Sequence, residues 1–282
     1  MNRIFITLAL CLVAIVAMAQ EKADIMVSYR YEQPNFKTGV RDTKYDYILL
    51  ANSRASKFYS PKTEYVDSMQ STPEGMAKLN EIARSAMTSG KMEDIPRPDG
   101  TMYVTKYLPD GKVWNYELVG MNRLYSEDDI PQIDWEISDS TKNVLGYDCN
   151  LATGELYGRK WNAWFASEIP VMNGPWKLSG LPGLILEAET VDGLYYFIAT
   201  GLQQTTQPIG PVYLADKYEK VSRKELLKSK RRFIDNPLGN INSQLGGKDA
   251  TFVIQDENGN PISANQRLFA PREEVDFIET DY

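Results

Sequence analysis

Few residues in this chain could do catalytic chemistry. The sequence contains no histidine, which removes Ser-His-Asp and Cys-His triads as well as histidine-ligated metal sites. Carboxylates remain as candidate acids and bases. Glu187 and Glu189 would lie on one face of a strand, about 7 Å apart, within the range that glycosidases use. Because strand alternation produces such pairs by chance, we interpret them as a solvated face, and the acidic run at 127–129 as a solvated loop.

Cys149 is the second of two cysteines and lies in the body of the chain. A lone thiol could react or pair with another chain. Cys149 alternates with Tyr147 and Leu151 along an expected strand, so a small buried residue is the preferred interpretation. Arg159 would lower the pKa of this thiol if the fold brought the two side chains together. The sequence therefore predicts no catalytic residue, no metal ligand and no cofactor.

Arg159 precedes an aromatic-rich strand expected at 160–166. Its planar fork of donors suits a carboxylate or several loop carbonyls. Trp161 and Phe165 share one face of this strand and are predicted core residues, while Trp164 points to the other face. Trp164 is thus the better candidate for contact with a sugar or a lipid, although packing in a core or an interface is preferred even here.

A stiff loop connects this strand to the next. Gly180 and Gly183 permit backbone angles that other residues resist, and Pro182 fixes its own. Such a loop could offer a binding edge, but a structural corner that lets the sheet bend is the preferred interpretation. The candidate binding residues of the strand pair and the loop are Cys149, Arg159, Trp164, Pro175, Trp176, Gly180, Leu181, Pro182 and Gly183.

The same region contains a series of short motifs. They are Gly-Tyr-x-Cys at 146–149, Gly-Arg-x-x-x-Ala-Trp at 158–164, Ile-Pro at 169–170, Gly-Pro-Trp at 174–176 and Gly-Leu-Pro-Gly-Leu-Ile at 180–185. In this order the motifs resemble the GLPGLI family of secreted proteins from Bacteroidota. Trp-Glu-Ile at 135–137 and Pro-Arg-Glu-Glu at 271–274 also look like the family, so the resemblance covers most of the chain. Leu151-Ala152 departs from it, since a basic residue before the alanine is more typical.

The resemblance implies a fold more than a function, because the family has no assigned activity to carry over. The implied fold is a curved antiparallel sheet with a few helices. That fold is similar to the LolA-like envelope proteins, which bind acyl chains in a half-open barrel. This comparison is an analogy of fold.

Short runs of alternating residues predict strands along most of the chain. The expected strands are 24–31, 45–52, 55–60, 101–107, 112–119, 133–137, 144–151, 160–166, 184–191 and 194–200, with 212–214 and 252–255 as further candidates. A helix is expected at 73–88, capped by Ser71 or Thr72, and another at 222–233, opened by a capping box. The basic residues at 223–232 are interpreted as a solvated helix face rather than a patch for anionic lipid or a partner.

Consecutive hairpins imply an antiparallel sheet, and a sheet of this many strands curls or splits. The predicted fold is mainly β (α+β): a curved antiparallel sheet or half-open barrel with about two helices, LolA-like by analogy. Because no internal repeat or linker interrupts the chain, residues 20–282 are expected to form a single β-rich domain of GLPGLI type. A turn is expected at 258–261, and residues 271–282 are expected to be loose.

Residues 1–19 have the order of a secretory signal peptide. Arg3 is followed by an apolar run to Val16 and by Ala-Met-Ala, so cleavage is expected between Ala19 and Gln20. The run is shorter than the ~20 apolar residues that a spanning helix needs, and the chain is not expected to span a membrane. The protein is therefore expected to be exported, periplasmic or outer-membrane-associated, and soluble after the signal is removed.

Charge and composition narrow the functions further. A formal net charge of −7 argues against nucleic-acid binding, which needs a basic face. The leading hypothesis is a non-enzymatic envelope protein that binds an apolar ligand, such as a lipid acyl chain, or a partner protein. The alternatives are a carboxylate-based periplasmic hydrolase and a structural or assembly partner of an outer-membrane complex.

Overall fold

The computed structural model describes residues 21–36, 39–235, 254–255, 261–262 and 276–282. The expected signal peptide at 1–19 and its cleavage site lie outside the described residues. So do the Pro-Arg-Glu-Glu motif at 271–274 and all of the expected 258–261 turn except Pro261.

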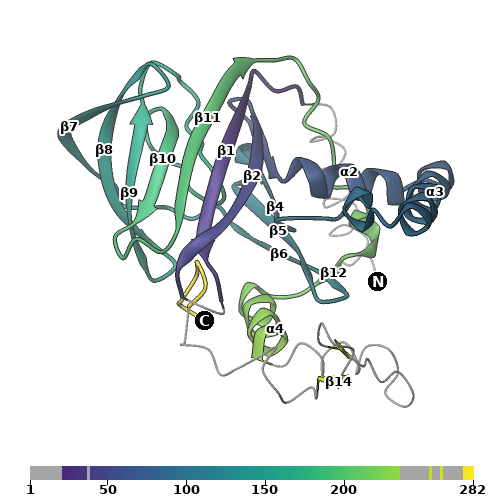
Figure 1. Cartoon of the computed structure of the whole chain (residues 1–282). Coiled ribbons are helices and arrows are strands. Elements are labelled where there is room, and N and C mark those ends of the chain that lie inside the picture. Colours follow the sequence, from purple (N-terminus) through teal and green to yellow (C-terminus); the bar gives the residue numbers. More distant parts are fainter. Residues whose placement is uncertain (1–20, 37–38, 236–253, 256–260, 263–275) are drawn as a thin grey trace, which may run out of the picture.

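One 12-stranded sheet organises the described residues (Figure 1). Its order is β12-β6-β5-β4-β3-β2-β1-β11-β10-β9-β8-β7, so two meanders, β1–β6 and β7–β11, are joined where β1 pairs with β11. Every pairing is antiparallel except that of β12 with β6, as the run of expected hairpins predicted. The strands are β1 (Ile25–Pro34), β2 (Arg41–Ala51), β3 (Ala55–Tyr59), β4 (Tyr103–Tyr107), β5 (Lys112–Val119), β6 (Asn122–Asp129), β7 (Glu136–Val144), β8 (Tyr147–Leu156), β9 (Arg159–Ala166), β10 (Leu184–Thr190), β11 (Tyr196–Gln204) and β12 (Glu219–Lys220); β13 (Ile254–Gln255) and β14 (Pro261–Ile262) form a separate pair.

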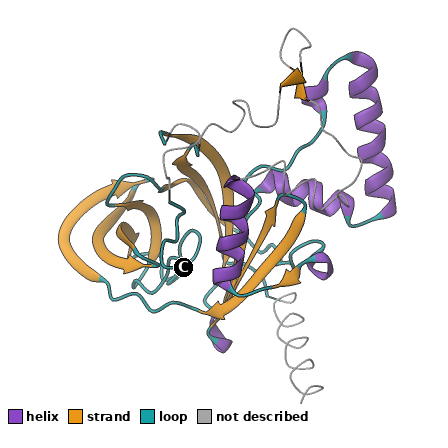
Figure 2. Cartoon of the chain, turned by 90° about the horizontal axis from the view of Figure 1, so that it is seen from below, coloured by secondary structure: helices purple, strands orange, loops and turns teal. Residues whose placement is uncertain are grey.

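The sheet is curved and open, which confirms the predicted fold class. The half that contains β7–β10 curls into nested arcs (Figure 2). Register shifts interrupt the pairing of β1 with β11, of β9 with β10 and of β7 with β8. An extra residue on one strand bends it and increases its twist, so these irregularities favour the curl.

Three α-helices in the described part of the chain flank the sheet, one more than predicted. The expected second helix is α4 (Arg223–Asp235), and the expected first is α3 (Pro73–Ser89), whose Thr72 cap accepts from the Gly75 N–H at 3.1 Å. The helix missed by the prediction is α2 (Pro61–Gln70), which Ser60 caps and Pro61 opens. Short 3₁₀ turns lie at η1 (Met92–Asp94), η2 (Leu108–Asp110) and η3 (Ala215–Lys217). No helix in the described ranges combines the length and the apolar character that crossing a membrane requires.

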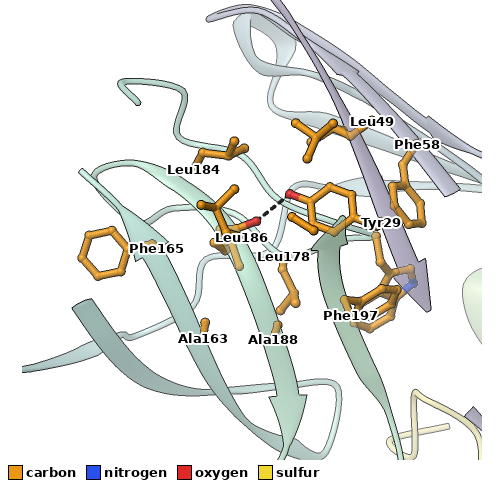
Figure 3. Packing of buried hydrophobic residues seen from close by; sticks show 14 of the residues in the cluster. Tyr29, Leu49, Phe58, Ala163, Phe165, Leu178, Leu184, Leu186, Ala188 and Phe197 are labelled. Atoms are coloured by element: carbon orange, nitrogen blue, oxygen red, sulfur yellow. Dashed lines mark hydrogen bonds between the residues drawn. The ribbon is translucent and has the colours of Figure 1, made fainter. Parts of the chain in front are cut away.

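The main core lies inside the curved sheet (Figure 3). It joins apolar side chains of β1, β2 and β8–β11 to the 167–183 loop. Tyr29 stands between the two meanders, and its hydroxyl donates to the Ile185 carbonyl at 2.6 Å. Trp161 and Phe165 are 0% and 2% exposed, so their prediction as core residues is confirmed.

Several local predictions are wrong, including the strand expected at 133–137, of which only residues 136–137 belong to β7. The acidic run expected as a solvated loop ends β6, because Glu127 pairs with Lys220 at 2.7 Å and β5 supplies a hydrogen-bonding partner strand. Residues 212–214 form no strand, and Leu214 has a φ of 57°, which a strand cannot accommodate. Residues 276–282 are packed rather than loose, because basic side chains from three other segments bind them.

Candidate functional site

A cavity of about 470 Å³ opens between β1, β2, β5, α4 and the 276–282 segment. Its walls are mainly aromatic and aliphatic, and the segments that build them lie far apart in the sequence. The principal aromatic residues are Tyr31, Tyr45, Tyr47, Tyr195, Phe233 and Phe277.

The tyrosine wall of the cavity is held rigidly. Tyr31 stacks on Phe197 with ring centroids 4.5 Å apart, and Tyr47 stacks on Phe58 at 4.6 Å. Tyr31 of β1 and Tyr47 of β2 are diagonal cross-strand neighbours, and their rings meet edge to face with centroids 6.0 Å apart. Stacked aromatic pairs of this kind fix ring orientation as well as burying area. The cavity therefore has a preformed wall.

Tyr31 also offers a polar group inside the apolar cavity. Its side chain is buried, and burial raises the pKa of its phenol well above the ordinary value. A buried hydroxyl that lines a cavity is a donor and acceptor for a ligand.

An ion pair closes one side of the cavity. Lys230 of α4 contacts Glu117 of β5 at 2.6 Å, and the Asn115 amide donates to the other carboxylate oxygen at 3.1 Å. Asp99, the second carboxylate in the wall, accepts from Ser60 and pairs with Lys62, both at 2.7 Å. Each carboxylate of the wall is thus bound to a lysine, and the Lys230 pair fastens α4 to the sheet.

Arg159 binds the 276–282 segment, which is yellow in Figure 1. Its guanidinium donates to the Phe277 carbonyl at 2.6 and 2.9 Å, to the Asp276 carbonyl at 3.2 Å, and to the Asp192 carboxylate. The expected partners, a carboxylate or several carbonyls, are therefore both present. The Arg159 guanidinium carbon lies 4.8 Å from the centre of the Tyr195 ring, and the Tyr195 hydroxyl donates to the Asp276 carbonyl at 2.6 Å.

Two further cations bind Glu279 and Asp281 of the segment. Lys177 contacts Glu279 at 2.6 Å, and the two side chains are 0% and 3% exposed. Arg223 of α4 contacts Glu279 and Asp281, each at 2.7 Å. The basic stretch of α4 is therefore more than the predicted solvated face, because Arg223 anchors another part of the chain.

Gly158 lets the segment approach the sheet. The amide of Thr280 donates to the Tyr157 carbonyl at 2.9 Å. A Cβ added at Gly158 would lie 2.2 Å from Thr280 Oγ1, and the φ of +81° strains any other residue. The glycine thus has a packing role that its place in the sequence motif did not indicate.

The predicted binding residues lie elsewhere in the fold. None of the nine is among the described residues that line the cavity. Trp176 and Leu181 are each 1% exposed in the core. Trp164, on the outer face as predicted, is half-buried with the Lys142 ammonium 5.5 Å above its ring. Of the nine, Cys149, Pro175, Trp176, Leu181 and Gly183 are buried, Trp164 is half-buried, and Gly180 and Pro182 are exposed on the 167–183 loop. Arg159 contacts the 276–282 segment that lines part of the cavity.

Cys149 is fully buried, and burial raises the pKa of its thiol to about 11. The Arg159 guanidinium is directed to the 276–282 segment and Asp192, so it is not positioned to lower this pKa. A buried thiol of this kind is unreactive.

The glycine- and proline-rich loop is fixed by packing. A Cβ at Gly183 would lie 2.2 Å from the Ala166 carbonyl oxygen. The buried Lys106 ammonium donates to Asn173 Oδ1 and to the Leu178 carbonyl, each at 2.8 Å, and burial lowers its pKa to about 7. The loop therefore forms a close-packed structural corner.

Glu187 and Glu189 are not a solvated pair. Glu187 is 6% exposed and contacts Lys142 at 2.6 Å, whereas Glu189 pairs with Arg41. Within the described ranges, no three Asp, Glu, Cys or His side chains come close enough together to hold a metal ion.

Comparisons with known proteins give a family match for only part of the chain. No curated protein matches it. Two solved structures of PNGF-II, in the P21 and C2 space groups, superpose with TM-scores of 0.47 and 0.49 at 13% identity. They cover 74% and 75% of this chain, and the chain spans about a third (33%) of each of them. The family model described as "Protein of unknown function (Porph_ging)" matches residues 158–187, the stretch that contains Gly158, Arg159 and Lys177.

Proposed function

We propose that this chain is an exported envelope protein that binds an apolar ligand, with a lipid acyl chain as the first candidate, in the cavity between β1, β2, β5, α4 and residues 276–282. One observation carries the proposal, namely a preformed, mainly aromatic cavity of about 470 Å³. Small-molecule sites have volumes of roughly 300–1,000 Å³, apolar walls and a few polar groups. An acyl chain gains about 0.8 kcal/mol for each buried methylene, so a site of this size would bind one usefully.

The proposed location depends on the signal-peptide pattern of residues 1–19 and on the resemblance to secreted GLPGLI proteins. The Porph_ging match supports a link to a family of unknown function over residues 158–187. In this proposal the protein works in the periplasm or at the outer membrane.

A titration with a fluorescent fatty acid, dansyl-undecanoic acid, tests the proposal. Met102 lines the cavity and packs against the main core, and Met102→Trp should fill the cavity and abolish binding. Val191 is 62% exposed and lies outside the cavity lining, so Val191→Trp is the matched control and should bind like the wild type. Absence of binding in the wild type, or equal binding by both variants, would overturn the proposal.

A carboxylate-based hydrolase is the second candidate, because Asp99 and Glu117 line the same cavity. Their lysine partners argue for a structural role, since each carboxylate is already engaged in an ion pair. Turnover of peptide or glycan substrates that disappears in both Asp99→Asn and Glu117→Gln, while fatty-acid binding is absent, would favour the hydrolase.

A further inference from the structure

We propose that docking of the 276–282 segment and occupation of the cavity are coupled, so that the segment acts as a strap that completes the ligand site. This inference rests on the proposed function. It adds that ligand affinity is controlled by contacts remote from the ligand.

The segment supplies part of the cavity wall. Phe277 and Ile278 line the cavity and are 2% and 8% exposed. The Phe277 ring meets the ring of Phe36, just beyond the end of β1, edge to face with centroids 5.6 Å apart. If the segment left its position, the cavity would lose two apolar lining residues and open to water, and apolar burial is the source of the affinity.

The charged anchors Lys177 and Arg223 lie outside the cavity. The Lys177 and Arg223 cations, which bind Glu279 and Asp281, do not line it, nor does Gly158, whose bare backbone accommodates Thr280. Docking can therefore be weakened by a substitution that touches no ligand.

Tyr195 connects the anchors to the cavity. Its ring lines the cavity, its hydroxyl binds the Asp276 carbonyl, and Arg159 lies over its face. A ligand that contacts this ring favours the docked position of the segment, and a docked segment favours the ligand. Thermodynamic linkage makes these two effects equal in size.

Two glycine variants of the full chain separate docking from backbone strain. Gly158→Ala places a methyl group against Thr280, while Gly146→Ala has a similar φ, +89° against +81°, but open space around the new Cβ. Both substitutions carry the strain of a left-handed residue, and only Gly158→Ala pushes on the segment.

The Thr280 side chain could rotate away from the new methyl group of Gly158→Ala. Two variants that each remove a charge therefore provide an independent test. Arg223→Gln removes the ion pairs to Glu279 and Asp281. Lys228→Gln removes an exposed charge from the same helix and serves as its control.

Hydrogen exchange of the 276–282 amides and titration with dansyl-undecanoic acid are measured on every variant. Gly158→Ala and Arg223→Gln should exchange faster and bind the probe more weakly, by about 5- to 150-fold for coupling of ordinary strength, and the controls should match the wild type. In the wild type, the probe should slow exchange of the same amides by a similar factor.

The outcomes also separate this inference from the proposed function. Faster exchange with unchanged probe affinity overturns the coupling and leaves the proposed function standing. Unchanged exchange in both anchor variants overturns the strap. A wild type that does not bind the probe overturns the proposed function, and the coupling with it.

Discussion

Replacing Glu279 with Gln should destabilise the protein more than any change at an exposed ion pair. Glu279 is 3% exposed and binds both Lys177 and Arg223. After the substitution the Lys177 ammonium, whose side chain is 0% exposed, would face a neutral amide in place of a carboxylate, beside the rings of Tyr157 and Trp176 at 4.8 and 5.6 Å.

The size of the effect follows from the burial of the pair. Removing one partner of a buried ion pair leaves a charge without compensation and costs about 3–5 kcal/mol. An exposed pair contributes only about 0–1 kcal/mol. Lys112 and Asp129, 38% and 84% exposed, form such a pair and make Asp129→Asn the matched control. The double variant Lys177→Met with Glu279→Gln should recover part of the loss, because it leaves no unpaired charge at position 177.

Urea unfolding followed by tryptophan fluorescence measures these differences. Glu279→Gln should lower the free energy of unfolding by about 3–5 kcal/mol and Asp129→Asn by at most about 1 kcal/mol. If the two variants lost equal stability, the 276–282 segment would not be held by a buried charge, and the description of its docking would be refuted.

Three further predictions concern the core. Burial lowers the pKa of Lys106 to about 7, so between that pH and about 10.4 the unfolded chain binds one proton more than the folded chain. In urea unfolding, the stability of the wild type relative to Lys106→Met should therefore rise between pH 7 and about pH 9.5. A difference that stays constant with pH would contradict this. Since burial raises the pKa of Cys149 to about 11, native protein should react with iodoacetamide far more slowly than a Val191→Cys variant reacts at its exposed site, and equal rates would contradict the burial. Gly183→Ala should cost more than about 1 kcal/mol, because its Cβ meets a backbone oxygen, whereas Gly210→Ala, with open space, should cost less; thermal unfolding that ranks them the other way would count against the close-packed loop.

Local sequence patterns predicted most of the sheet because they act over a few residues. The strand expected at 112–119 has those bounds in the structure, and the alternation in β9 correctly assigned Trp161 and Phe165 to the core. Arg159 was predicted to bind a carboxylate or carbonyls, and it binds both. Periodicity and donor geometry are properties of a single segment, so they can be recognised without the fold.

The missed elements depend on local signals that were overlooked or on distant partners. Ser60 and Pro61 are a cap and a first-turn proline, and they could have indicated α2. The acidic end of β6 has no strand-like pattern. It can still form a strand because cations of other segments, Lys112 and Lys220, compensate its charges. Such pairing exists only in the folded chain.

The cavity could not be predicted from the sequence, because it also depends on contacts between distant segments. Tyr31, Phe233 and Phe277 come from three segments separated by more of the chain than any pattern spans, and each alone looks like an ordinary core residue. The prediction instead concentrated on residues 158–187, whose motif builds the support for the wall. The sequence motif thus indicated Arg159, which binds the 276–282 segment, but not the cavity that this segment lines.

Photo-cross-linking with a diazirine-bearing fatty acid tests the central claim most directly. After illumination of the full chain and peptide mapping by mass spectrometry, the label should fall on peptides that contain Tyr31, Tyr47, Phe233 or Phe277, and Met102→Trp should remove it. A label spread over other surfaces, or one that persists unchanged in Met102→Trp, would contradict a ligand site in this cavity.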